Sequence, residues 1–123
     1  RAAWSNCNRA PQVMLSKIYD NPDLLQRIKN ERAGYRDMLI RRGRTFEAAA
    51  AEAGLEIVPF DAGFFASVPC RDSEAVAANL EKEGIFTIPL SMGIRISIAS
   101  IPEDKCRMLP AKILEAMKQA GVA

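Results

Sequence analysis

The sequence predicts an α+β domain in which helices cover one face of a small, mostly antiparallel sheet. Three observations predict this fold class. Apolar residues recur at three- and four-residue steps over a long N-terminal stretch, which is the spacing of an amphipathic helix. Short runs of β-branched and aromatic residues follow, bounded by glycine and proline, as is typical of strands joined by turns. Further helical patterns separate and follow these runs, so the strands have helices to pack against.

The N-terminal part is predicted to form a short helix and then a long one. The short amphipathic helix begins near Pro11. The long helix extends over about residues 22–53, because Asn21 is a favourable N-cap residue and Pro22 fits the first helical position. Gly54 suits the left-handed backbone that ends many helices.

The long helix has two unusual features. It contains Gly34 and Gly43, and a glycine inside a helix costs about 1 kcal/mol relative to alanine. We expect both glycines to be tolerated, as weak points where the helix bends. The helix is also far longer than the mean of about 11–12 residues, so we expect it to reach past the core and pack on something else.

The second part, over about residues 55–120, is predicted to alternate strands and helices. The expected elements are an extended piece over 55–60, a strand over 64–68, a helix from Asp72 or Ser73 to Glu83, strands over 85–88 and 93–99 joined by a turn at Pro89–Met92, and a last helix that begins at Pro102. Pro110 lies inside that last helix, so we expect it to kink the helix or to divide it in two.

The strand over 93–99 carries the most informative residue. Its isoleucines Ile94, Ile96 and Ile98 share one face, which must be buried. Arg95 lies on the opposite face. One interpretation is an ordinary surface arginine on the open side of a sheet. The other is a receptor for a carboxylate or phosphate, because a guanidinium offers a planar fork that matches two oxygen atoms.

Composition excludes several function classes. The 123 residues carry a net charge of +2 with basic and acidic residues interspersed, so we expect no nucleic-acid partner. No apolar run approaches the roughly 20 residues of a membrane span, and the polar N-terminal residues predict no signal peptide. The three cysteines have no CxxC spacing, which argues against a disulfide framework and against a metal site. We expect reduced thiols in a cytoplasmic protein. The absence of histidine removes the commonest general base.

Several motifs occur in a characteristic order. They are Arg1-Ala-Ala-Trp-Ser-Asn6, Asp61-Ala-Gly-Phe-Phe65, the segment from Leu80 to Pro89, Gly93-Ile-Arg-Ile-Ser-Ile-Ala-Ser100 and Pro102-Glu-Asp. Together they resemble the C-terminal small domain of pyridoxal-phosphate-dependent aminotransferases of fold type I, in particular the aspartate and aromatic amino acid aminotransferase branch. The resemblance covers essentially the whole chain, residues 1–123, and implies that the long helix is of the kind that runs between two domains.

The resemblance implies roles for three residues in substrate binding. Arg95 matches the arginine that binds the α-carboxylate of the amino-acid substrate, and thereby orients the Cα–H bond. Arg1 matches an arginine that reaches across the dimer interface to the distal carboxylate of a dicarboxylic substrate. Phe65 matches a position in the wall of the substrate pocket, although plain core packing is the alternative for Phe64 and Phe65.

The resemblance also implies what this chain lacks. The cofactor lysine of the family lies in a Ser/Thr-x-x-Lys segment that has no counterpart here, so we expect no catalytic, cofactor-binding or metal-binding residue and no transaminase activity from this chain alone. The chain opens without Met and looks like a fragment. Pyridoxal 5'-phosphate, amino-acid and 2-oxo-acid substrates, a large domain and a second subunit of a homodimer are expected only in the intact enzyme.

Two other functions remain open. One is a small α+β regulatory module that binds an amino acid or another anion at Arg95. The other is a protein-interaction domain that uses the long helix as its docking face. An amino acid that bound tightly to this chain, and no longer bound after Arg95→Ala, would favour the regulatory module.

Overall fold

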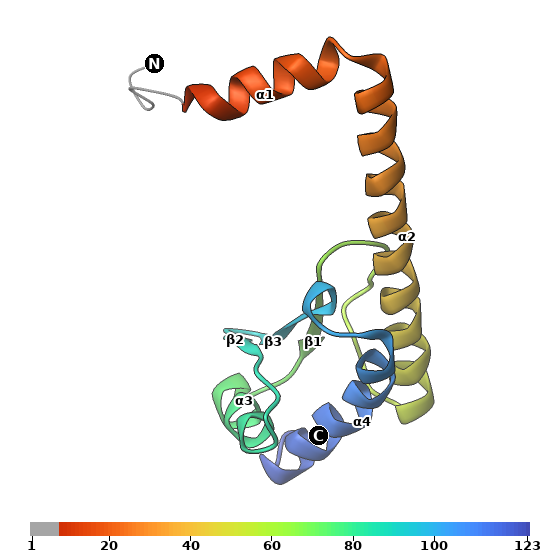
Figure 1. Ribbon diagram of the computed structural model, residues 1–123. Coiled ribbons are helices and arrows are strands. Elements are labelled where there is room, and N and C mark those ends of the chain that lie inside the picture. Colours follow the sequence, from red (N-terminus) through yellow and green to blue (C-terminus); the bar gives the residue numbers. More distant parts are fainter. Residues whose placement is uncertain (1–7) are drawn as a thin grey trace. The chain divides into compact units, whose positions relative to one another are not determined.

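The computed structural model describes residues 8–123 (Figure 1). Its helices and strands, in chain order, are α1 (Arg9–Tyr19), α2 (Pro22–Ala53), β1 (Phe65–Pro69), α3 (Ser73–Lys82), β2 (Ile88–Leu90), β3 (Gly93–Ser97), the short 3-10 helix η1 (Ile98–Ser100) and α4 (Glu103–Gln119). The predicted α+β fold is therefore confirmed. Among the described helices, none combines the length and the hydropathy needed to cross a membrane.

The chain divides into two compact units, and the boundary falls inside α2, between Arg36 and Asp37. In the first unit, α1 contains no buried residue. The side chain of Asn21 accepts a hydrogen bond of 3.0 Å from the backbone N–H of Leu24, which confirms the predicted cap of α2.

The C-terminal end of α2 also follows the prediction. Gly54 has a φ of +72°, and the N–H of Leu55 donates to the carbonyl of Ala50. This is the backbone pattern in which a left-handed glycine satisfies the last carbonyl groups of a helix. The residues Asn21, Pro22 and Gly54 were thus sufficient to place both ends of a helix of 32 residues.

The sheet of the second unit is antiparallel throughout, with strand order β1-β3-β2. Ala66 pairs with Ile96 and Val68 with Ile94, and these four side chains are buried. Figure 1 shows α3 and α4 on one side of the three strands.

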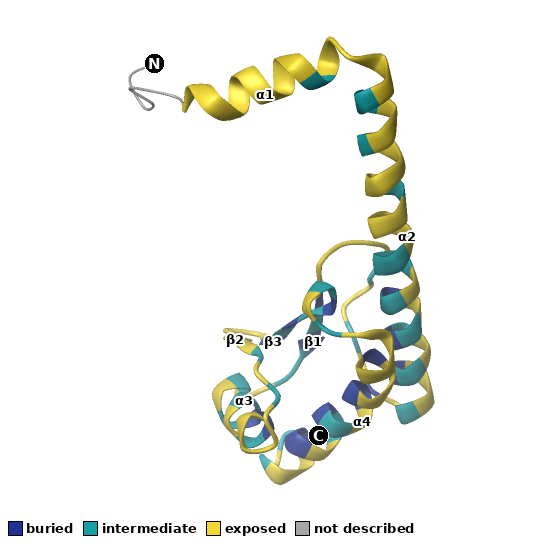
Figure 2. Cartoon of the chain, viewed as in Figure 1, coloured by how far each residue is buried: buried dark blue, intermediate teal, exposed yellow. Residues whose placement is uncertain are grey.

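A single apolar core lies on the helix-covered side of the sheet. Its buried residues come from the C-terminal half of α2, from all three helical segments that follow, and from β1 and β3: they include Phe46, Ala50, Ala66, Val68, Val76, Leu80, Ile94, Ile96, Ile98, Cys106 and Ile113. Figure 2 shows these positions as buried segments of ribbon around the sheet. The predicted buried face of Ile94, Ile96 and Ile98 is confirmed, because these side chains are at most 4% exposed.

Three expectations about the elements need correction. The strand expected over 85–88 is β2, Ile88–Leu90, so Pro89 pairs with Ile94 instead of opening a turn. This is possible because β2 is an edge strand, where a missing N–H can face away from the sheet. The strand expected over 93–99 ends at Ser97, where η1 begins.

The third correction concerns the division of the last helix, one of the two outcomes expected at Pro110. Pro110 does not divide it, since α4 is one helix from Glu103 to Gln119 with Pro110 buried inside it. Gly43 also has a packing role that the sequence did not predict. A Cβ atom at this position would overlap the ring of Phe60, so the glycine leaves space for that ring against α2.

Candidate functional site

Arg95 lies on the central strand of the sheet, on the face opposite the core. It pairs with Ser67 of β1 on one side and with Ile88 of β2 on the other. Hydrogen bonds to two neighbouring strands hold the backbone of β3 more firmly than a loop would be held. The position of Arg95 on this face, half-buried, is as the alternation of the sequence predicted.

The aromatic ring of Phe65 packs against the guanidinium of Arg95. The Cζ atom of Arg95 lies 4.7 Å from the centroid of the ring, which is within the range of a cation–π interaction. The Phe65 side chain is 47% exposed, so it is not a core residue. Two of the three residues implied in substrate binding are thus brought together, whereas Arg1 lies outside the described residues.

One atom of Arg95 is unusual. Its Nε is buried and has no hydrogen-bond partner among the described residues. A buried donor without an acceptor costs about 1–3 kcal/mol, and more when the group is charged. Buried polar groups without a partner are common at binding sites, where a side chain serves the ligand and not the stability of the fold. Arg95 is therefore a candidate anion-binding residue.

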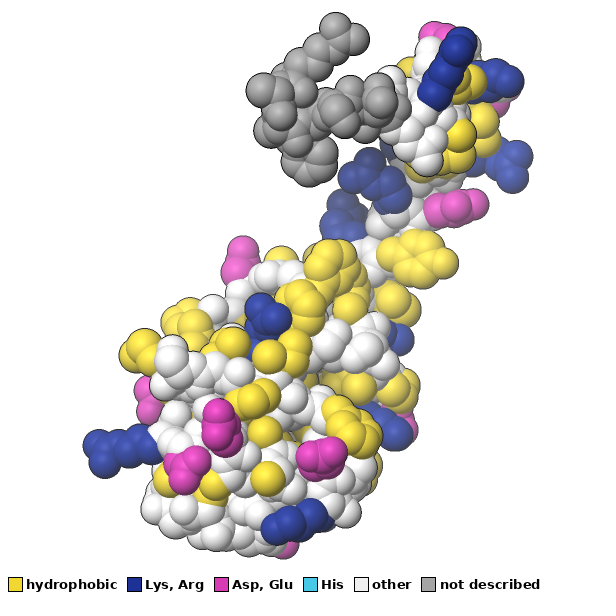
Figure 3. All heavy atoms as spheres, turned by 90° about the vertical axis from the view of Figure 1, so that its left-hand side faces the viewer, with side chains coloured by type: hydrophobic (Ala, Val, Ile, Leu, Met, Phe, Trp, Pro, Cys, Tyr) yellow, Lys and Arg dark blue, Asp and Glu magenta, His cyan; other side chains and the backbone are white. Residues whose placement is uncertain are grey.

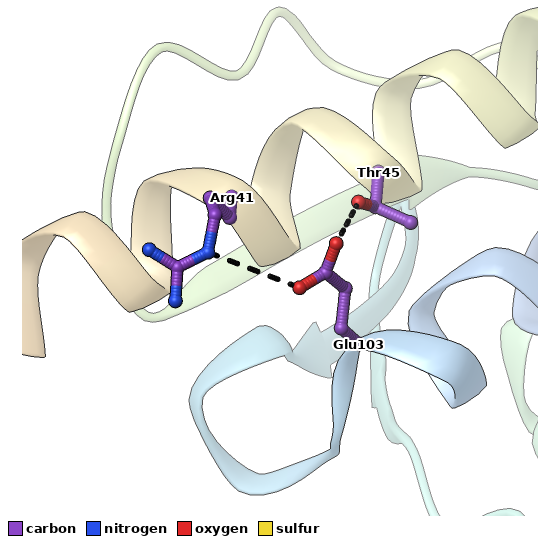
Figure 4. Close-up of polar contacts among 3 residues, drawn as sticks. All are labelled: Arg41, Thr45 and Glu103. Atoms are coloured by element: carbon purple, nitrogen blue, oxygen red, sulfur yellow. Dashed lines mark hydrogen bonds and ion pairs between the residues drawn. The ribbon is translucent and has the colours of Figure 1, made fainter.

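Polar contacts anchor the chain just after β3 to the helix α2. The Nη1 of Arg42 donates a hydrogen bond of 2.9 Å to the carbonyl of Ala99 in η1. Figure 4 shows a second contact, in which the Glu103 carboxylate at the start of α4 accepts a hydrogen bond of 3.2 Å from Thr45 and lies 4.0 Å from the Nε of Arg41. These contacts fix the segment that follows Arg95.

Sequence reasoning missed these anchoring residues. Arg42 belongs to the same stripe of α2 as Phe46, which is fully buried. A charge within an apolar stripe was the available signal, because such a charge needs a polar partner where it meets the core. The partner is a backbone carbonyl far along the chain, and the sequence does not mark it.

Lys112 does not fit the Schiff-base role that pyridoxal 5'-phosphate requires. Lys105 and Lys112 line a cavity of about 480 Å³ together with Phe86 and Met108. The carboxylate of Glu83 lies 2.8 Å from the Nζ of Lys112, and its hydrogen bond raises the pKa of Lys112, so this amine is held protonated. A Schiff-base lysine needs a lowered pKa instead. We therefore derive no reaction step through the cofactor.

The thiols of Cys70 and Cys106 are poor candidates for a nucleophile. Burial raises the pKa of the thiols of Cys70 and Cys106, which disfavours the nucleophilic thiolate. Among residues 8–123, no cluster of acidic, cysteine or histidine side chains is suited to a metal ion. The face drawn in Figure 3 carries basic and acidic side chains interspersed with hydrophobic ones over the Asp37–Ala123 unit.

Comparison with known proteins supports an aminotransferase-related domain. No protein-family model matches the sequence, and none of the curated proteins matches it. The structure is similar to an aminotransferase from Anaerococcus prevotii, with 32% sequence identity and a TM-score of 0.89 over 96% of this chain and 29% of that chain. An aromatic aminotransferase from Pyrococcus horikoshii matches with 19% identity and a TM-score of 0.57 over 85% of this chain and 30% of that chain, which is a likeness of fold alone.

The chain thus spans less than a third of the length of the aminotransferases that it matches. The four α-helices and three antiparallel strands within residues 8–123 are consistent with a small aminotransferase domain. The chain has the fold of part of an aminotransferase.

Proposed function

We propose that this chain is the C-terminal, substrate-carboxylate-binding domain of a pyridoxal-phosphate-dependent aminotransferase. The enzyme would transfer an amino group from an aspartate-type or aromatic L-amino acid to a 2-oxo acid. The observation that carries the proposal is the match of 96% of the chain to a solved aminotransferase with a TM-score of 0.89. The placement of Arg95 on the central strand supports the assignment of the binding residue.

Arg95 would bind the α-carboxylate of the substrate. Its guanidinium can make two parallel N–H···O bonds, which fix the orientation of the carboxylate as well as its position. The substrate Cα–H bond is oriented as a result, and orientation contributes to the rate because the reacting atoms then need no further ordering. Phe65 would form part of the pocket wall, and Arg1 would bind a distal carboxylate of dicarboxylic substrates.

The remaining catalytic groups would come from elsewhere in the enzyme. Pyridoxal 5'-phosphate, when bound, supplies the electron sink for the amino-group transfer. The lysine that holds it would belong to the large domain, and a second subunit would complete the active site in a cytoplasmic homodimer. The chain alone would then be inactive.

Replacing Arg95 in the enzyme that contains this chain tests the proposal. We expect Arg95→Ala to lower kcat/KM for amino-acid substrates by roughly 30-fold to several thousandfold, as is typical when one partner of a desolvated charge pair is lost. Arg107→Ala is the matched control, because Arg107 is an exposed arginine on α4, and it should leave kcat/KM within twofold or so.

Two results would contradict the proposal. One is an unchanged kcat/KM in Arg95→Ala. The other is tight binding of an amino acid to the 123-residue chain alone, abolished by Arg95→Ala, which would assign the regulatory module instead. Pyridoxal 5'-phosphate added to this chain could also be followed by absorbance near the edge of the visible range. A stable imine seen in this way would show that the chain has a cofactor site of its own.

A further inference from the structure

We propose that Phe65 is a positioning residue for Arg95, and that it holds the guanidinium with its two terminal Nη groups, and not its Nε, available to an anion. The inference rests on the proposed function, because it concerns how the same arginine binds a carboxylate. It gives Phe65 a role through Arg95, in addition to its place in the pocket wall.

The register of the sheet brings the two residues together. Phe65 pairs with Ser97 and Arg95 pairs with Ser67, so Phe65 and Arg95 are diagonal neighbours on one face of adjacent antiparallel strands. Diagonal neighbours are within reach of aromatic and long side chains. The ring lies 4.7 Å from Cζ, so it contacts the flat guanidinium itself and not only the aliphatic stem.

The exposure of the ring argues for a role in positioning. The Phe65 side chain is 47% exposed and contributes to neither the core nor its edge. Burial of apolar surface therefore does little to explain an aromatic residue at this place. The guanidinium is the group that gains from the ring, since an aromatic face attracts a cation and limits its rotation.

The buried Nε determines which edge of Arg95 can accept a ligand. A guanidinium can bind a carboxylate through the two Nη groups or through Nε and one Nη. The Nε of Arg95 is inaccessible and has no partner among the described residues. An incoming oxygen atom cannot reach it in this arrangement, so the terminal edge with both Nη groups is the binding edge.

Loss of the ring should weaken anion binding without removing the binding group. The guanidinium would gain rotational freedom that binding must then remove, and its Nε would become accessible to water. We expect Phe65→Leu to weaken the binding of succinate roughly three- to tenfold, which is the scale of one cation–π contact. Phe65→Tyr keeps the ring and should retain the affinity.

Side-chain ¹H–¹⁵N NMR of the enzyme that contains this chain, titrated with succinate, tests the proposal. In the native protein the Arg95 Nε–H should resonate upfield through the ring current and exchange slowly with water, and succinate should shift the Nη signals. Phe65→Leu should remove the upfield shift and speed the exchange. Phe64→Leu is the matched control, because Phe64 is a neighbouring exposed phenylalanine, and it should leave both signals unchanged.

The outcomes separate the positioning role from the proposed function. An upfield shift and a succinate affinity that both survive Phe65→Leu would overturn the positioning role. A larger response to succinate at Nε–H than at Nη would overturn the assignment of the binding edge. No response at Arg95 to succinate, with the ring-current shift intact, would overturn the carboxylate role of Arg95 and with it the proposed function.

Discussion

Cys106 is a thiol whose surroundings favour the neutral form. It is fully buried in the core, and this burial raises the pKa of the thiol, although the positive charge of Arg42 opposes the shift. In the unfolded chain the thiol titrates near its ordinary pKa of 9.0. The folded state therefore binds the proton more tightly than the unfolded state does.

The pH dependence of stability follows from this difference. The contribution of Cys106 to the free energy of unfolding is fully present below the pKa that the thiol has in the unfolded chain. It is lost as the pH rises through the pKa that the thiol has in the folded protein. We expect the free energy of unfolding to decrease above about pH 9, by at most about 1.4 kcal/mol per pH unit for this one group. Urea unfolding of the native chain and of Cys106→Ala, both in a Cys70→Ala background, checks this. Equal pH slopes in the two proteins would contradict it.

The sequence was sufficient to predict the position of Arg95 but not its contact with Phe65. The alternation of isoleucine with polar residues was enough to put Arg95 on the open face, because the period of a strand is a local property. The partnership with Phe65 depends on the register between β1 and β3, about 30 residues apart in the chain. Register arises from non-local pairing, which no local pattern specifies.

Two neighbouring arginines of α2 allow a test at the level of secondary-structure elements. Arg42 is half-buried and donates a charge-assisted hydrogen bond to the Ala99 carbonyl, which joins α2 to the segment after β3. Arg41 is exposed, and its Nε lies 4.0 Å from Glu103. We expect Arg42→Ala to lower the free energy of unfolding by about 1.5–3 kcal/mol, because the carbonyl loses a charged donor.

Arg41→Ala is the matched control on the same helix. An exposed ion pair contributes about 0–1 kcal/mol, so this variant should unfold at nearly the urea concentration of the native chain. Urea unfolding followed by circular dichroism measures both. Equal losses in the two variants would mean that the hydrogen bond between Arg42 and Ala99 does not join the elements as the structure indicates.

Helix ends were predicted more accurately than strand ends, for a physical reason. Helix ends are marked by local chemistry, as Asn21 and Gly54 show for α2 and as the Asp72 side chain shows by accepting from the N–H of Ala75 at the start of α3. The bounds of β2 depend instead on which residues find partners on β3. Pro89 was expected in a turn, because a proline is tolerated within a strand only at the edge of a sheet. Whether β2 is an edge strand depends on the strand order, which is a property of the folded sheet.

At the scale of the whole molecule, the apolar core belongs to one of the two units. Among residues 8–123, every buried core residue lies between Phe46 and Met117, within the Asp37–Ala123 unit. In the first unit, α1 has no buried residue and exposes Met14, Leu15 and Tyr19. Burial of apolar surface is the main source of stability in folding, so the free energy of unfolding should come from the second unit.

A shortened chain tests this assignment. We expect a chain that begins at position 36, with Arg36→Ser to supply a new N-cap for the remaining part of α2, to unfold cooperatively. Its free energy of unfolding should lie within about 1 kcal/mol of that of the full chain, because none of the removed residues that the structure describes is buried in the core. Urea unfolding followed by near-ultraviolet circular dichroism measures this.

Native-state hydrogen exchange of the full chain supplies an independent check. Backbone amides of α1 should exchange through local opening, far faster than those of β3 and α4, because a helix without buried side chains has little tertiary stabilisation. The amides of the core elements should exchange only through global unfolding. If α1 were protected to the same degree as β3, or if the shortened chain failed to fold, the first unit would contribute to the stability of the second, contrary to the distribution of the buried residues.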